Sequence, residues 1–90
     1  MSHTQTEIQW EPVALEKYNK MLTRIPIFHR DIARQVVWKK AELNAKARGA
    51  SQIQENDLSQ AFLSEVPKAF YSLMVRIMDE VHLEYKKYES

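Results

Sequence analysis

The 90-residue sequence contains no cysteine and only one glycine, and each shortage removes a class of function. Without thiols the chain cannot supply disulfides, a thiol nucleophile, a zinc–thiolate site or ligands for an iron–sulfur cluster. A single glycine excludes a glycine-rich phosphate loop. With only three prolines besides, the chain keeps long uninterrupted segments, which favours helices over many short strands.

The chain also lacks a strong net charge and a long apolar run. Thirteen basic and twelve acidic residues give a formal net charge of +1, which argues against nucleic acid as a partner. No apolar stretch approaches the roughly 20 residues of a membrane span. The first residues lack the charged start and apolar middle of a signal peptide. We therefore expect a cytoplasmic protein that does not enter a membrane.

Helical spacing of apolar residues predicts an all-α fold with a short–long–short core of three helices and an added C-terminal helix. We expect residues 1–9 to be a flexible N-terminus and residues 10–90 to form one domain. The predicted helices cover residues 12–23, 27–48, a segment that starts at 55 or 56, and 67–88. Between the second and third helices, a short extended link carries one apolar residue, Ile53.

Prolines and the glycine mark the helix ends. Pro12 suits a first helical turn, and Pro26 disfavours helical geometry at Ile25, so the first helix ends there. Gly49 fits the left-handed conformation that often follows a helix. Phe28, just after this turn, is expected to fill the joint between the first two helices.

A helical wheel divides the long helix into three sides. One side is apolar and is expected to face the core, with His29 at its edge; it carries Ile32, Val36, Leu43 and Ala47. A charged side, expected to face solvent, carries Asp31, Gln35, Lys39, Glu42 and Lys46. The third side carries Arg30, Arg34, Trp38, Ala41, Ala45 and Arg48.

Two interpretations of the third side remain open. Its alanines would let the fourth helix or a second subunit pack closely. Alternatively, Trp38 stacks on a ligand whose carboxylates or phosphates bind Arg30 and Arg34. The fourth helix raises a similar question, because its broad apolar side fits either the small core or the seam of a homodimer. That side carries Phe70, Leu73, Met74, Ile77, Met78, Val81 and Tyr88.

Catalytic and metal-binding patterns are missing. His3, His29 and His82 lie far apart and have no metal-ligand spacing. Asp31 and Glu42 lie on the side of the long helix that is expected to face solvent, so they offer no poised acid or base. We therefore predict no catalytic residues, no metal site and no enzyme activity for the chain alone.

Residues 45–61 resemble the end of a histone fold, in which a long helix ending in Ala-Lys-x-x-Gly is followed by a strand-like link and an Asp-Leu helix start. In histone pairs the long helices cross. This resemblance implies a dimer, and as a function it implies DNA binding through Arg24, Arg30, Arg34 and Arg48.

A second resemblance covers residues 10–62. Trp10, Ile25-Pro26-x-Phe28-x-Arg30-x-x-Ala33-Arg34, Ala47-Arg48-Gly49 and Ile53 are similar to the small C-terminal domain of the light-independent protochlorophyllide reductase B subunit. This domain also occurs as a short free-standing protein. The resemblance implies an accessory domain in chlorophyll biosynthesis, which accompanies a nitrogenase-like catalytic body.

The second resemblance also implies a set of contacts. Arg30 and Arg34 would meet tetrapyrrole propionates or the acidic surface of a reductase subunit, and Phe28 and Trp38 would give aromatic contact. Arg48 is a further candidate, and His29, as an axial ligand or proton-handling group, is a weaker one. No cofactor would be bound covalently. The alternatives are a histone-like DNA-binding dimer and a pure interaction or dimerisation module. The structural signature that the resemblance implies consists of Trp10, Ile25, Pro26, Gly49 and Ile53.

Overall fold

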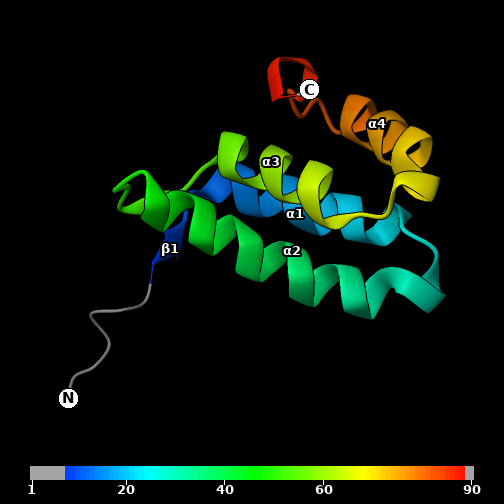
Figure 1. Ribbon diagram of the computed structural model, residues 1–90, viewed down its shortest axis with the longest axis horizontal. Helices are drawn as coiled ribbons and strands as arrows, with labels where there is room; N and C mark the ends of the chain where they lie inside the picture. The colour runs from blue at the N-terminus through cyan, green and yellow to red at the C-terminus, as the bar shows by residue number, and fades with distance from the viewer. Residues whose placement is uncertain (1–7, 89–90) are drawn as a thin grey trace.

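Four α-helices make up most of the structure, a computed structural model that describes residues 8–88 (Figure 1). The all-α class and the short–long–short order are confirmed, because the first three helices have 13, 21 and 11 residues. Residues 1–7 of the expected flexible N-terminus lie outside the described residues. In chain order the elements are β1 (Gln9–Trp10), α1 (Pro12–Arg24), α2 (Ile27–Ala47), β2 (Gln52–Ile53), α3 (Glu55–Glu65), the 3-10 turn η2 (Lys68–Phe70), α4 (Tyr71–Glu80) and the 3-10 turn η3 (Lys86–Tyr88).

Side chains and breakers fix the helix ends close to the predicted positions. Glu11 caps α1, because its Oε1 accepts a hydrogen bond from the Ala14 N–H at 2.8 Å. Pro26 immediately precedes α2, and its ring supplies the sharp change of direction between α1 and α2. Gly49 has a φ of 72° just beyond α2, which is the conformation that glycine adopts without strain.

The link between α2 and α3 forms a small parallel ladder with the segment that precedes α1. Gln9 pairs with Gln52, and Trp10 pairs with Ile53. The Glu11 N–H adds a hydrogen bond of 2.9 Å to the Ile53 carbonyl. Gln9, which was expected to be part of the loose N-terminus, is therefore held in a strand. The ladder joins the start of α1 to the turn between α2 and α3.

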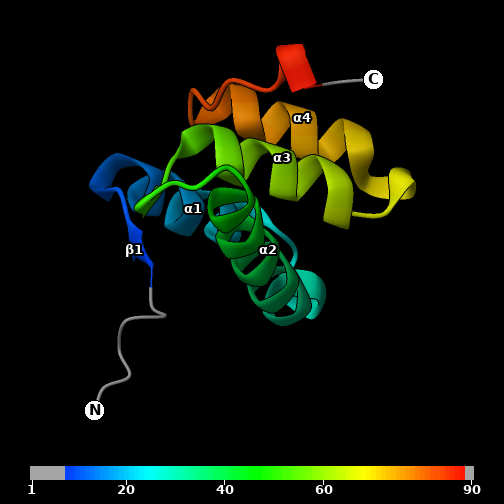
Figure 2. The ribbon, with the colours of Figure 1, turned by 60° about the vertical axis from the view of Figure 1, so that its left-hand side comes forward.

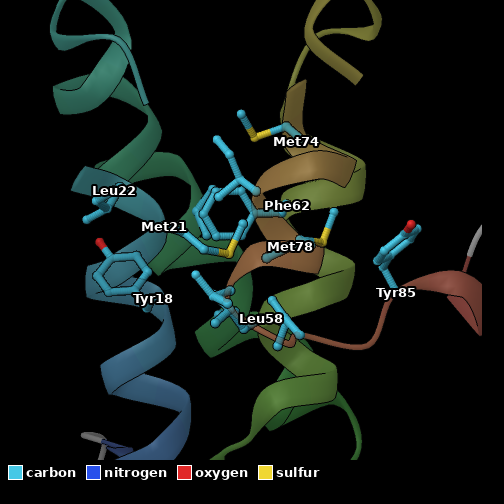
Figure 3. Packing of buried hydrophobic residues seen from close by; sticks show 14 of the residues in the cluster. Tyr18, Met21, Leu22, Leu58, Phe62, Met74, Met78 and Tyr85 are labelled. Carbon is cyan, nitrogen blue, oxygen red and sulfur yellow. The ribbon is translucent and has the colours of Figure 1, made fainter. Parts of the chain in front are cut away.

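The core lies between α1, α3 and α4, while α2 packs along α3. Figures 1 and 2 show α2 and α4 on opposite sides of α3. In Figure 3, Met21 of α1 lies beside Leu58 and Phe62 of α3, whereas the Tyr18 hydroxyl points away from them and donates to the Arg34 carbonyl of α2. Met78 of α4 completes this cluster, and all five side chains are buried. Within residues 8–88, every helix is too short or too polar to cross a lipid bilayer.

The buried side of α2 is the one that carries alanines. Val37, Ala41 and Ala45 are fully buried, and α3 packs against this part of the helix. The expectation that the fourth helix or a second subunit covers it was wrong. The expected core side lies at the surface instead, with Ile32 69% exposed and Leu43 50% exposed. The reason is steric, because the small alanine side chains let a neighbouring helix approach closely.

Phe28 does not fill the joint between α1 and α2. Its side chain is 88% exposed, and the buried residue at this joint is Ile25. Helix α2 begins at Ile27, directly after Pro26, so its first turn projects beyond the end of α1. Phe28 therefore points away from the core.

The fourth helix is shorter than predicted. It spans Tyr71–Glu80, with the 3-10 turn η2 before it, and ends where His82 takes a positive φ of 62°. The Leu83 N–H then donates to the Met78 carbonyl at 2.8 Å, which closes the helix end. Beyond the helix, Leu83 and Tyr85 are buried, so residues 83–85 return to the core.

The apolar side of α4 belongs to the core of a single chain. Met74, Ile77 and Met78 are all at most 3% exposed. Beyond the helix, the Ser59 hydroxyl donates to the Glu84 carbonyl, so α3 also holds the returning tail. The core interpretation of this side is therefore the one that the structure supports.

Candidate functional site

Arg30 is engaged in holding the turn between α1 and α2. Its Nη2 donates to the Ile25 carbonyl at 3.0 Å and to the Thr23 carbonyl at 3.2 Å. Its Nε donates to Ile25 as well, at 3.3 Å. Carbonyls at the end of a helix have no partner within the helix, so the guanidinium satisfies groups that α1 leaves open. The side chain thus has a structural role that leaves few of its donors for a ligand.

Arg34 makes an ion pair with Asp31, one turn earlier in α2. Both side chains are more than half exposed, so solvent screens this pair strongly. The carbonyl of Arg34 accepts a hydrogen bond of 2.9 Å from the Tyr18 hydroxyl. Of the predicted arginines, Arg34 is the one whose guanidinium stays open to solvent on this side.

Trp38 belongs to a cluster of three rings. Its ring centroid lies 4.9 Å from that of Trp10 and 5.4 Å from that of Tyr18. Trp10 and Tyr18 are 5.0 Å apart. These are ordinary aromatic packing distances, so the indole of Trp38 helps to fix the β1 segment on α1 and α2.

Two polar groups in the ring cluster are unusually placed. The Trp10 Nε1 is buried and has no hydrogen-bond partner within residues 8–88. Burial raises the pKa of Tyr18 to about 12, although the nearby Arg34 charge acts in the opposite direction.

The two predicted aromatic contacts, Phe28 and Trp38, are separated by about 15 Å of helix rise, so they do not form one binding surface.

Arg48 forms a bidentate ion pair with Asp57 in the first turn of α3. Its Nε and Nη2 lie 2.8 and 2.7 Å from the two carboxylate oxygens. The hydrogen bond to Asp57 raises the pKa of Arg48. Asp57 is fully buried and also accepts from the Gln54 N–H at 2.8 Å, as part of a capping box. Arg48 therefore fixes the link between α2 and α3.

An apolar cleft of about 110 Å³ lies between the start of α2 and the junction of α3 with α4. The His29 ring packs on Phe70 at its edge, with ring centroids 5.1 Å apart. His29 and Glu65 are the charged or titratable residues in its wall. The cleft is lined by Ile25, Pro26, His29, Ile32, Ala33, Val36, Glu65, Val66, Pro67, Phe70, Leu73 and Met74.

Exposed apolar side chains of α2 continue the cleft outward. We call Phe28, Ile32, Val36 and Leu43 the α2 apolar face; these residues are 88, 69, 37 and 50% exposed. Ile32 and Val36 also line the cleft, so the two features form one surface. The sequence did contain its signal, namely the apolar spacing on α2, but this spacing was assigned to the core.

This surface is suited to binding rather than to bond-making chemistry. Its wall is almost wholly aliphatic or aromatic, with His29 and Glu65 as its titratable side chains. Within residues 8–88, no three His, Cys, Asp or Glu side chains are grouped so that they could hold a metal ion. No protein-family model matches the sequence, and no curated protein or solved structure is significantly similar to it.

Proposed function

We propose that the chain is a non-catalytic accessory domain that acts by binding another protein chain through the α2 apolar face and its cleft. One observation carries the proposal: Phe28 and Ile32 stand 88 and 69% exposed beside an apolar cleft. Each such side chain gains roughly 1.5–3 kcal/mol when it is fully removed from water, so the surface favours association. The resemblance to the accessory domain of protochlorophyllide reductase supports the same kind of role.

A second copy of the chain is the occupant that the geometry favours. A two-fold dimer needs one patch that complements itself. Here a projecting ring, Phe28, lies next to a hollow whose wall includes the adjacent residue His29. A two-fold axis near Ile32 would place Phe28 of each chain at the cleft of the other. The cleft volume of about 110 Å³ is of the same order as the ~150 Å³ cavity that accepts benzene.

The tetrapyrrole hypothesis receives less support from the geometry. A pigment bound through its propionates would compete with the backbone carbonyls for Arg30. The cleft is also smaller than the roughly 300 Å³ at which ligand pockets begin. The DNA-binding hypothesis also receives less support, because the guanidinium groups of Arg30 and Arg48 already make hydrogen bonds within the chain.

Sedimentation velocity across micromolar to near-millimolar concentrations tests the proposal. We expect the wild-type chain to self-associate and Ile32→Asp to remain a monomer, because the new carboxylate would be buried in the interface. Asn19→Asp is the matched control, since it adds the same charge at an exposed position on α1. Circular dichroism should show that both variants keep the fold.

Two outcomes would count against the proposal. One is a wild-type chain that stays monomeric over the whole concentration range. The other is a dimer that survives Ile32→Asp unchanged. A separate titration with protochlorophyllide addresses the pigment hypothesis, for which a shift in pigment absorbance that Arg34→Ala abolishes would be the supporting result.

A further inference from the structure

A second and larger groove, of about 820 Å³, follows the outer side of α3. Its walls come from α2, from the junction of α3 with α4, and from the C-terminal turn η3. Figure 1 looks onto α2 and α3 from the front, with α4 and η3 above them. The groove is lined by Lys40, Asn44, Gln60, Leu63, Ser64, Val66, Lys68, Tyr71 and Tyr88.

Among residues 8–88, the charged side chains that line the groove are basic. They are Lys40 and Lys68, and no carboxylate of this described part of the chain lines it. Neither lysine has an ion-pair partner within residues 8–88, whereas Lys17 is paired with Glu55. The chain as a whole is nearly neutral, so this imbalance is local. An anion is therefore the kind of ligand that the groove complements electrostatically.

Aromatic and amide groups accompany the two lysines. Tyr71 and Tyr88 come from opposite ends of the C-terminal region and line the same groove. Tyrosine rings offer faces on which a flat ligand can stack. The Gln60 amide has no hydrogen-bond partner within residues 8–88, so it is free to bind a ligand. The Asn44 amide, by contrast, is used, because it donates to the Asp57 carbonyl at 3.1 Å.

We propose that this groove binds a small organic anion with a flat aromatic body. Lys40 and Lys68 would neutralise its acidic group or groups, and Tyr71 and Tyr88 would contact its ring. The groove volume falls within the roughly 300–1,000 Å³ typical of small-molecule sites, which favours a small ligand over an extended polymer. The groove shares Val66 with the cleft, but it uses neither Phe28 nor Ile32, so the variant Ile32→Asp can separate this site from the proposed dimer.

An NMR titration of the intact, isotope-labelled chain tests the site with two probes, adenosine monophosphate and naphthyl phosphate. At least one probe should shift the amide signals of Lys40, Gln60 and Ser64 in a saturable manner. Adenosine lacks the anionic group and inorganic phosphate lacks the aromatic ring, so each should bind about tenfold more weakly than the probes. Ile32→Asp should leave this binding unchanged, which separates the site from the dimer.

Charge variants complete the experiment. Lys40→Gln and Lys68→Gln should each weaken binding about tenfold, since each removes a charged contact. Lys39→Gln removes the same charge from the neighbouring residue, which does not line the groove, and should have little effect. The proposal is overturned if neither probe binds, if inorganic phosphate binds as tightly as the probes, or if Lys39→Gln causes the same loss. It is also overturned if an acidic peptide of glutamates binds more tightly than both probes.

Discussion

Arg48, which follows the last residue of α2, and Asp57, in the first turn of α3, form a bidentate ion pair with N–O distances of 2.8 and 2.7 Å. The carboxylate is buried, and it also accepts a hydrogen bond from the Gln54 N–H. One pair of side chains thus holds both helices and the β2 link between them. This is where the single glycine, Gly49, lets the chain turn.

Replacing Arg48 should therefore lower the stability of the fold. Arg48→Ala leaves the buried Asp57 carboxylate without its counter-ion, and we expect a loss of about 2 kcal/mol in the free energy of unfolding. This value lies below that of a fully buried pair, because the Arg48 side chain is 38% exposed. Arg24→Ala is the control, since its pair with Glu80 is exposed on both sides and should contribute less than about 1 kcal/mol. Equal losses in urea unfolding would refute the structural role of Arg48.

The buried indole nitrogen of Trp10 leads to a second prediction. Trp10→Phe keeps a ring against Tyr18 and Trp38 and removes an N–H that has no acceptor within residues 8–88. An unsatisfied buried donor costs about 1–3 kcal/mol, so this change should be neutral or stabilising. Trp10→Ala removes the ring and should lower stability by about 3 kcal/mol. Thermal unfolding of the two variants compares them, and a similar loss in both would contradict the prediction.

Tyr18 should make the fold sensitive to alkali. Burial raises its pKa to about 12, whereas the unfolded chain ionises near 10, so the folded state favours the neutral phenol. The contribution of the neutral Tyr18 phenol to the free energy of unfolding is therefore complete below pH 10 and is lost as the pH rises from 10 to 12. The total loss is about 3 kcal/mol, from roughly 1.4 kcal/mol per pKa unit.

Unfolding in urea at several alkaline pH values measures this loss. Tyr18→Phe should flatten the decline, although it also gives up the hydrogen bond to the Arg34 carbonyl. Tyr85 adds a decline of the same sign, because burial raises its pKa as well. A wild-type profile that is flat between pH 10 and 12 would show that Tyr18 ionises freely in the folded chain.

The helix ends could be predicted from the sequence because they depend on local chemistry. Pro12, Pro26 and Gly49 each restrict or release the backbone at one position, and the structure places them at helix ends. The early stop of α4 was missed, since it depends on His82 taking a left-handed conformation that few side chains adopt. The burial of Leu83 and Tyr85 favours that turn, and it is a tertiary effect.

The orientation of α2 could not be predicted from hydrophobicity alone. Ile32 and Leu43 are more apolar than Ala41 and Ala45, yet the alanines are buried. Close packing of two helices requires small side chains where they touch. A helical wheel is drawn from the sequence of one helix, so it does not show on which side a neighbouring helix packs. The same error concealed the cleft, because Ile32 and Val36 were assigned to the core.

The most direct test of the account is an isotope-filtered nuclear Overhauser experiment on a mixture of labelled and unlabelled chains. The proposed dimer places Phe28 of one chain in the cleft of the other, so its ring protons should show contacts between chains to the Leu73 and Met74 side chains. These contacts should vanish in Ile32→Asp. A mixture of associated chains without any such contact, or contacts within one chain only, would contradict the proposed mode of association.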